Sequence, residues 1–265
     1  MAGLLAPFQT IARYWFILRR AVLADIRAVY AGSVLGRLWL VVGLLLMLGV
    51  YGITYGAIFG FRPPDMSLTM YIMYVFCGLV PFLAFSAGLS SGTMSLVANR
   101  GLLLNTAFPA ELIPLRSVMA ASIGMPVGAG IAFAAGIALG YASPTWLLVP
   151  LVVVFEIMFL TGLCWMLSLV ALLFRDIQQI IYYVVMMLSV LTPIAYTPSM
   201  VPPQLALLIY LNPASYFVIS FQTLVILGTL PTLKVTVIMT VMSLAVFIIG
   251  FHLCRRAKSA YYDFA

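Results

Sequence analysis

Charged side chains are scarce in this chain of 265 residues, where they make up only 7% of the sequence. A soluble domain has about 25% charged residues, so the composition excludes an ordinary soluble protein. Hydrophobic residues make up 65% of the chain, as expected for an integral membrane protein. The length allows several spans with short loops but no appended soluble domain, and we expect one transmembrane domain over residues 1–265.

Residues that build metal and catalytic sites are also few. Cys77, Cys164 and Cys254 lie far apart in apolar runs and have no metal-binding or redox spacing. The single histidine, His252, has no acidic neighbour in sequence, and the six acidic residues are scattered. General acid–base chemistry needs a well-placed titratable group. We therefore predict neither a metal site nor a catalytic residue.

The sequence also lacks a phosphate-binding loop for ATP. Such a loop ends in Gly-Lys-Ser/Thr, whereas the two lysines, Lys234 and Lys258, follow Leu233 and Ala257. If ATP drives this protein, a separate polypeptide has to hydrolyse it.

Long apolar runs fill most of the chain. About 20 apolar residues cross the hydrocarbon core of a bilayer as a helix. We expect an all-α membrane protein with six transmembrane spans, at residues 38–59, 70–97, 118–141, 146–174, 180–195 and 235–253.

Prolines break this pattern between the fifth and sixth runs. Proline interrupts helices, and irregular backbone at membrane depth persists only where it is buried in protein or lines a water-filled cavity. The short apolar pieces within 199–227 have lengths that suit a pair of re-entrant helices on the external side. We predict that this broken stretch belongs to a translocation path, and its candidate residues are Pro193, Tyr196, Pro198, Asn212 and Pro213.

Basic residues indicate the orientation in the membrane. A seventh span through 214–227 would place Arg255 and Arg256 opposite the N-terminal arginines, whereas six spans keep them together. Eleven of the 13 basic residues then share one side, all except Arg62 and Lys234. An excess of Lys and Arg marks the cytoplasmic side, so both termini are predicted to be cytoplasmic.

An amphipathic helix is predicted before the first span, over residues 8–31. Its apolar face repeats at spacings of three and four, at Ile11, Trp15, Leu18, Val22, Ile26 and Val29. The opposite face carries arginines seven residues apart, at Arg13, Arg20 and Arg27. Such a helix lies in the membrane interface, where arginines reach lipid phosphates or an adjacent protein. The sequence leaves open whether it is a topology anchor or a gate.

Four groups of residues, in this order, resemble the membrane subunit of bacterial polysaccharide ABC exporters, the O-antigen, teichoic-acid and capsule export family. The similarity covers nearly the whole chain and is greatest to the O-antigen type. The groups are Asp25–Tyr30 with Ser33–Trp39; Asn99 with Phe108, Pro109 and Pro114; Phe174–Gln179; and Thr192–Tyr196 with Leu211–Pro213.

The resemblance implies a homodimeric permease of the bacterial inner membrane, bound to two cytoplasmic ATP-binding cassette ATPase subunits. ATP and Mg would then bind the partner subunit, with no cofactor in this chain. The implied cargo is a polysaccharide on an undecaprenyl-pyrophosphate-type lipid. The family also has an N-terminal interface helix and re-entrant helices before the last span, which the residue patterns indicate independently.

The longest predicted cytoplasmic loop covers residues 99–114. In the family this region is a coupling helix that docks on the ATPase, with Asn99, Arg100, Gly101, Leu103 and Asn105 as the matching residues here. The simpler interpretation is that its leucines continue the second span.

Arg175 and Asp176 open the next cytoplasmic turn, where a structural role is favoured over contact with substrate.

Two further groups are candidate substrate contacts. Arg13, Arg20, Arg27 and Arg37 are candidates for binding the lipid pyrophosphate or for gating. Tyr51, Tyr55 and Glu156 are candidate channel-lining residues. The two tyrosines lie four residues apart and share a helical face, which could contact sugar rings or another helix. Glu156 lies ten residues after Trp146, near mid-membrane, and could face the pore, a helix contact or a dimer interface.

Two other classes of function compete with an ABC permease. An ion-coupled secondary transporter needs ionisable groups along its path, and here the span interiors offer only Glu156, with His252 near one end. Such transporters also have inverted repeats, and none is visible. A membrane-embedded enzyme acting on lipid-linked sugars is less favoured, because no nucleophile–base arrangement can be identified.

Overall fold

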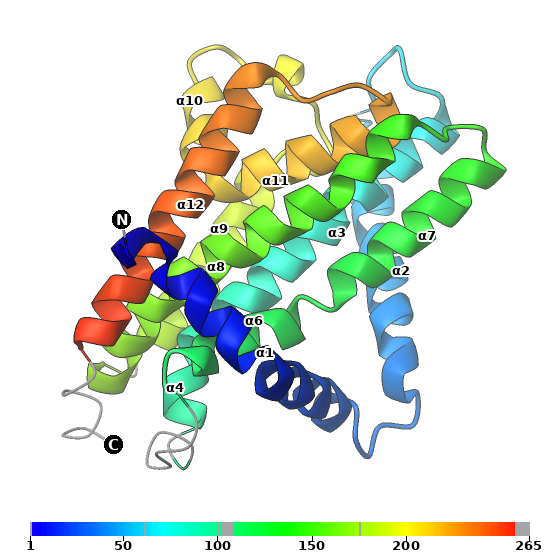
Figure 1. Cartoon of the computed structure of the whole chain (residues 1–265). Coiled ribbons are helices and arrows are strands. Elements are labelled where there is room, and N and C mark those ends of the chain that lie inside the picture. Colours follow the sequence, from blue (N-terminus) through cyan, green and yellow to red (C-terminus); the bar gives the residue numbers. More distant parts are fainter. Residues whose placement is uncertain (1, 61, 100, 102–108, 175, 258–265) are drawn as a thin grey trace.

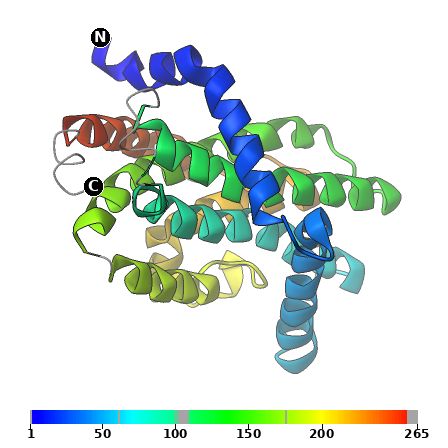
Figure 2. The ribbon, with the colours of Figure 1, turned by 90° about the horizontal axis from the view of Figure 1, so that it is seen from below.

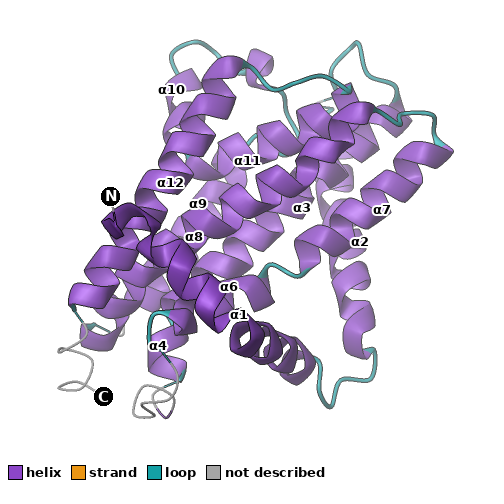
Figure 3. Ribbon diagram, viewed as in Figure 1, coloured by secondary structure: helices purple, strands orange, loops and turns teal. Residues whose placement is uncertain are grey.

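The computed structural model describes residues 2–60, 62–99, 101, 109–174 and 176–257, and within these ranges the protein consists of helices and loops without β-strands (Figures 1 and 3). The helices, including short 3₁₀ and π segments labelled η, are α1 (Ala2–Val29), η1 (Gly36–Leu38), α2 (Trp39–Tyr51), η2 (Gly52–Ile58), α3 (Leu68–Thr93), α4 (Ser95–Ala98), α6 (Leu112–Ala121), α7 (Gly124–Ala138), η3 (Pro144–Leu148), α8 (Val149–Leu173), α9 (Ile177–Leu191), η4 (Pro198–Met200), α10 (Ala206–Leu211), α11 (Pro213–Gln222), η5 (Thr223–Leu227) and α12 (Leu233–Arg256).

Five helical segments of the described chain are long and apolar enough to cross a membrane: Gly36–Ile58, Leu68–Thr93, Leu112–Ala138, Pro144–Leu173 and Leu233–Arg256. They coincide with five of the six expected spans. The remaining expected span corresponds to α9, which has 15 residues and is shorter than a full crossing. The structure therefore establishes five candidate spans, and a sixth crossing remains a prediction.

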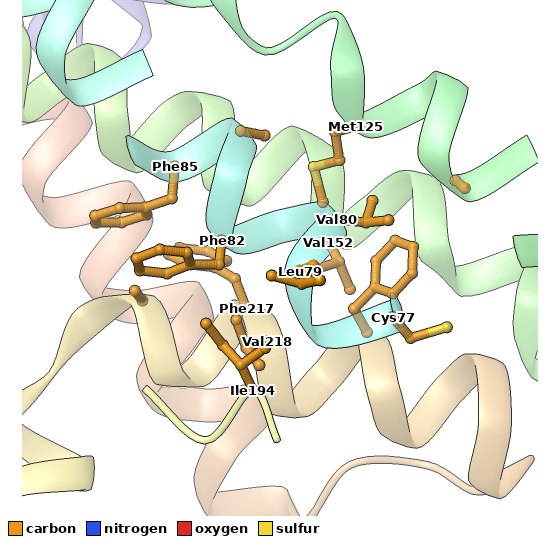
Figure 4. Packing of buried hydrophobic residues seen from close by; sticks show 14 of the residues in the cluster. Cys77, Leu79, Val80, Phe82, Phe85, Met125, Val152, Ile194, Phe217 and Val218 are labelled. Carbon is orange, nitrogen blue, oxygen red and sulfur yellow. The ribbon is translucent and has the colours of Figure 1, made fainter. Parts of the chain in front are cut away.

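Helix α3 lies at the centre of the bundle. Helix α3 contributes more side chains than any other helix to the largest buried apolar cluster, which also takes side chains from α7, α8 and α11. Figure 4 shows part of this packing, with Phe82 and Phe85 of α3 beside Phe217 of α11. Gly92 lets α8 approach closely, because a Cβ atom there would lie 2.5 Å from the sulfur of Cys164. The central position of α3 means that any path through one subunit has to run along its sides.

Helices α8 and α12 run side by side in the same direction (Figure 1). Their closest approach joins two glycines, since a Cβ atom on Gly162 would overlap the backbone of Val246 and one on Gly250 would overlap the backbone of Gly162. Small residues at a helix crossing let two membrane helices pack backbone against backbone. This contact anchors the last helix, α12, to the core.

The N-terminal helix α1 crosses the bundle at one end, as Figure 2 shows from below. Leu18 and Val22 are buried against Leu112 and Leu115 of α6. The buried face is shorter than the periodicity predicts, because Trp15 is 49% exposed and Val29 is 71% exposed. The helix crosses α6 at an angle, so its middle turns pack on α6, whereas Phe8 near its start packs against Phe247 of α12.

One ion pair fixes the far end of that crossing. The guanidinium of Arg116 on α6 donates two hydrogen bonds to the carboxylate of Asp25 on α1. This fork-shaped pairing is a strong geometry for Arg and a carboxylate. Helix α6 begins at Leu112, ahead of the predicted start at residue 118, and so includes Arg116.

Candidate functional site

The proline-rich stretch after α9 is irregular, and the surrounding protein covers much of it. Helix α9 ends at Leu191, and the chain continues without helix from Thr192 to Thr197. The side-chain amide of Asn212 donates to the hydroxyl of Thr192 over 2.7 Å, and its oxygen accepts from the backbone of Ala214 over 2.9 Å. Asn212 therefore caps the start of α11 and ties that helix to the irregular stretch.

A second tie comes from the other end of α11. The amide nitrogen of Gln222 donates to the carbonyl of Ile194 over 3.0 Å and to the carbonyl of Tyr74 over 3.2 Å. Gln222 thus joins α11, α3 and the irregular stretch. Gly78 makes room for this contact, because a Cβ atom there would lie 2.5 Å from the Gln222 nitrogen. We call Gln222, Gly78 and Ile194 the glutamine clasp.

Sequence reasoning missed this clasp. Its one readable signal is a glutamine inside an otherwise apolar helical run, which predicts a buried hydrogen bond but not its acceptor. The clasp and the Asn212 cap satisfy polar groups of a non-helical segment inside the protein, which is the condition for irregular backbone at membrane depth.

Tyrosines gather beside the same stretch. Tyr71 donates its hydroxyl to the carbonyl of Ala195 over 3.1 Å, and Tyr196 donates to that of Leu191 over 2.7 Å. Tyr51 donates to the carbonyl of Ser189 over 3.3 Å, which joins the first span to the end of α9. The rings of Tyr51 and Tyr55 stack with centroids 5.5 Å apart. Tyrosine rings therefore line the protein next to the irregular stretch, and we call Tyr51, Tyr55, Tyr71 and Tyr196 the tyrosine wall.

This wall continues along the first span. Phe59 lies edge-on to Tyr55 with ring centroids 5.9 Å apart. The segment Gly52–Ile58, which carries Tyr55, is a π-helix, a wider turn that is common at functional sites. The shared face predicted for Tyr51 and Tyr55 is present, and their contact with a substrate remains a prediction.

Glu156 lies inside the subunit rather than on an open surface. Its side chain is 1% exposed, and neither carboxyl oxygen has a hydrogen-bond partner among the described residues. Helices α8 and α12 run in parallel, and Gly162, six residues after Glu156, lies against the backbone of Val246 and Gly250. Ser243 therefore lies at about the same level of the bundle as Glu156. The hydroxyl of Ser243 is likewise buried without a partner. The structure thus shows Glu156 buried within one subunit, and its role remains a prediction.

The candidate arginines lie apart from the tyrosines. Arg13, Arg20 and Arg27 are exposed on α1, and Arg37 is exposed in η1. The guanidinium of Arg20 lies 4.1 Å from the ring centre of Phe16, which holds it along the helix surface. The exposed arginines are accessible to lipid headgroups or to another protein.

Part of the predicted coupling region lies outside the described residues. Arg100, Leu103 and Asn105 belong to that part, as does Arg175 in the next turn. Asn99 ends α4, and its amide donates to the carbonyl of Ser95 over 2.8 Å. Gly101 is exposed. The predicted coupling segment therefore begins at the C-terminal end of α4, and its role remains a prediction.

A comparison with protein families identifies the chain. The model of the ABC-2 type transporter family matches residues 13–226. The chain belongs to this family. The match begins in α1 and ends in η5, so it includes the exposed arginines, the tyrosine wall and the irregular stretch.

Individual relatives agree with this assignment. A Klebsiella pneumoniae protein named "O-antigen export system permease protein RfbA" is 27% identical over 234 residues, which cover 84% of this chain and 87% of the relative. A Myxococcus xanthus protein of the same name is 27% identical over 216 residues, covering 80% of this chain and 81% of the relative. The ABC-2 chain described here is thus a multi-pass membrane protein similar over most of its length to transport permeases.

Proposed function

We propose that this ABC-2 protein is the permease subunit of an ATP-driven exporter that moves lipid-linked polysaccharide, of the O-antigen type, across the bacterial inner membrane. The lipid is of the undecaprenyl-pyrophosphate kind. The observation that carries the proposal is the similarity to O-antigen export permeases over at least 80% of both chains. This similarity includes the broken stretch, the part of the chain whose local structure departs furthest from a simple span.

The geometry of α9 supports a path at this place. A helix of 15 residues is about 22 Å long, and the hydrocarbon core is about 30 Å thick. The irregular residues 192–197 continue the chain beyond α9, tied to α11 by Asn212 and Gln222. Together they complete the sixth crossing, and α10 and α11 form the re-entrant pair. The stacked Tyr51 and Tyr55 offer flat apolar faces along which sugar rings can slide.

Two subunits form the channel in this proposal. The face of α9 that carries Tyr182, Tyr183, Met186 and Val190 is exposed, and the first span, Gly36–Ile58, is only 6% buried. These faces border the tyrosine wall, so a homodimer that pairs them encloses a path lined by both copies. The interface of a membrane homodimer is isologous, with the same surface used twice.

Energy comes from a partner in this proposal. The sequence has no phosphate-binding loop, so two ATPase subunits bind ATP and Mg and dock on the coupling segment that starts at Asn99. Both termini are then cytoplasmic, with the arginines of α1 at the inner headgroups. A proton relay is disfavoured, because Glu156 is buried without a carboxylate or histidine partner among the described residues.

A cellular export assay tests this function. In a strain that lacks this gene, we expect lipid-linked glycan to accumulate inside the cell and surface glycan to be lost. The chain restores export together with its ATPase, but not with an ATPase whose catalytic residue is inactivated. Export that persists with the inactive ATPase would indicate a secondary transporter. Turnover of a lipid-linked sugar by the purified chain alone would indicate an enzyme.

A further inference from the structure

A cavity with several polar side chains in its lining lies away from the tyrosine wall, at the end of the bundle that α1 crosses. Its volume is about 470 Å³, within the range of roughly 300–1,000 Å³ that is common for small-molecule sites. It is bounded by the end of α1, by α3 and α4, and by α6. The polar residues that line it are Asp25, Tyr30, Ser91, Ser95, Asn99 and Ser117.

Three of these residues form a polar stripe. Ser91, Ser95 and Asn99 are four residues apart, so they lie on one side of α3 and α4. Ser95 is only 1% exposed, and its hydroxyl has no hydrogen-bond partner in the described structure. Buried polar groups are nearly always paired, and an unpaired one is costly. The cavity therefore presents a buried hydroxyl whose bonding capacity is unused.

The charge of the lining indicates the class of ligand. No lysine or arginine is among the residues that line the cavity in the described structure, whereas one carboxylate, that of Asp25, is. Arg116 already neutralises this carboxylate through their ion pair. Among the described lining residues, a phosphate would thus find no free cation. Hydroxyls, an amide and a tyrosine ring instead suit a neutral ligand rich in hydroxyl groups, as a sugar is.

From these observations we infer that the cavity binds the sugar unit next to the lipid pyrophosphate before translocation. The inference rests on the proposed function. The exposed arginines of α1 contact the pyrophosphate outside the cavity, and the hydroxyls of Ser91, Ser95 and Ser117 contact the sugar within it. Recognition of the sugar and of the phosphate is thereby divided between two groups of residues.

The experiment uses the chain and its ATPase reconstituted in lipid nanodiscs. Binding is measured by thermophoresis for farnesyl pyrophosphate and for farnesyl pyrophosphate bearing one hexose or one N-acetylhexosamine. Two net hydrogen bonds raise affinity by about tenfold, so at least one sugar-bearing lipid should bind about tenfold more tightly than the bare lipid. Ser91→Leu, at the exposed wall of the cavity, should abolish this difference and leave binding of the bare lipid unchanged.

Two further variants make the result specific. Ser95→Ala removes the buried hydroxyl without adding volume and should reduce the sugar-dependent difference about threefold. Ser90→Leu is the matched control, because Ser90 is exposed on α3 but lines a different cavity, and it should keep the full difference.

Equal binding of all the lipids by the wild-type complex would overturn this inference alone. Binding of none of them would overturn the proposed function with it. Loss of the difference in Ser90→Leu as well would also overturn the assignment to this cavity.

Discussion

The substitution Gly78→Ala tests the glutamine clasp directly. The added Cβ would lie 2.5 Å from the amide nitrogen of Gln222 and 2.9 Å from the carbonyl oxygen of Ile194. Either Gln222 gives up its two hydrogen bonds or α11 and the irregular stretch move away from α3. Overpacking of this kind costs about 1–3 kcal/mol, and each hydrogen bond between membrane helices contributes about 0.6 kcal/mol. We expect Gly78→Ala to lower the free energy of unfolding by about 2–4 kcal/mol.

A double-mutant cycle separates the two contributions. Gln222→Ala alone removes both hydrogen bonds and should cost about 1–2 kcal/mol. In the double variant the new methyl group no longer meets the glutamine. The cost of the double variant should therefore be lower than the sum of the two single costs by about 0.5 kcal/mol or more. The relief should be incomplete, because the backbone of Ile194 stays within 3.0 Å of the added Cβ.

The assay is equilibrium unfolding of the purified protein in mixed micelles, followed by tryptophan fluorescence. Gly130→Ala is the matched control, since a Cβ there meets nothing within 4 Å and the change should be neutral or slightly stabilising. An unchanged stability of Gly78→Ala, or strictly additive costs in the double variant, would refute the clasp.

Three other substitutions test separate parts of the structure. Gly162→Ala should destabilise the protein by about 3 kcal/mol or more in the same unfolding assay, because the added Cβ overlaps the backbone of α12; a neutral result would contradict that packing. Glu156→Gln should retain most export, whereas Glu156→Leu should lose more, and loss of export by the glutamine variant with the ATPase still active would show that ionisation is needed. Replacing Arg13, Arg20 and Arg27 with glutamine should slow export, while membrane insertion, measured by fractionation, stays normal. An unchanged export rate would favour the interpretation of α1 as a topology anchor.

Several features of the fold could be predicted because they depend on local sequence. The apolar runs predict five of the long helices, and the prolines predict the irregular stretch after α9. The end of α9 at Leu191, four residues before the predicted end, also has a local cause. Proline at 193 disfavours helical backbone at the preceding residue, so the helix has to stop early.

Other features depend on contacts between distant residues. Arg116 lies ahead of the predicted start of its span at residue 118, and nothing in the sequence indicates that its partner is Asp25, 91 positions away. The bond from Gln222 to Ile194 spans 28 positions, and neither residue indicates the other. The cavity combines residues of α1, α3, α4 and α6, so its stripe at Ser91, Ser95 and Asn99 could be noticed in the sequence only as a spacing.

Transport in proteoliposomes tests directly whether this protein exports lipid-linked glycan with energy from ATP. The chain would be reconstituted with its ATPase and a fluorescent lipid-linked glycan, and glycan that has crossed the bilayer would be measured by its protection from an added glycosidase. We expect protection that grows with time only when ATP and Mg are present and the ATPase is catalytically active. Protection that develops at the same rate without ATP, or that fails to develop with all components present, would contradict it.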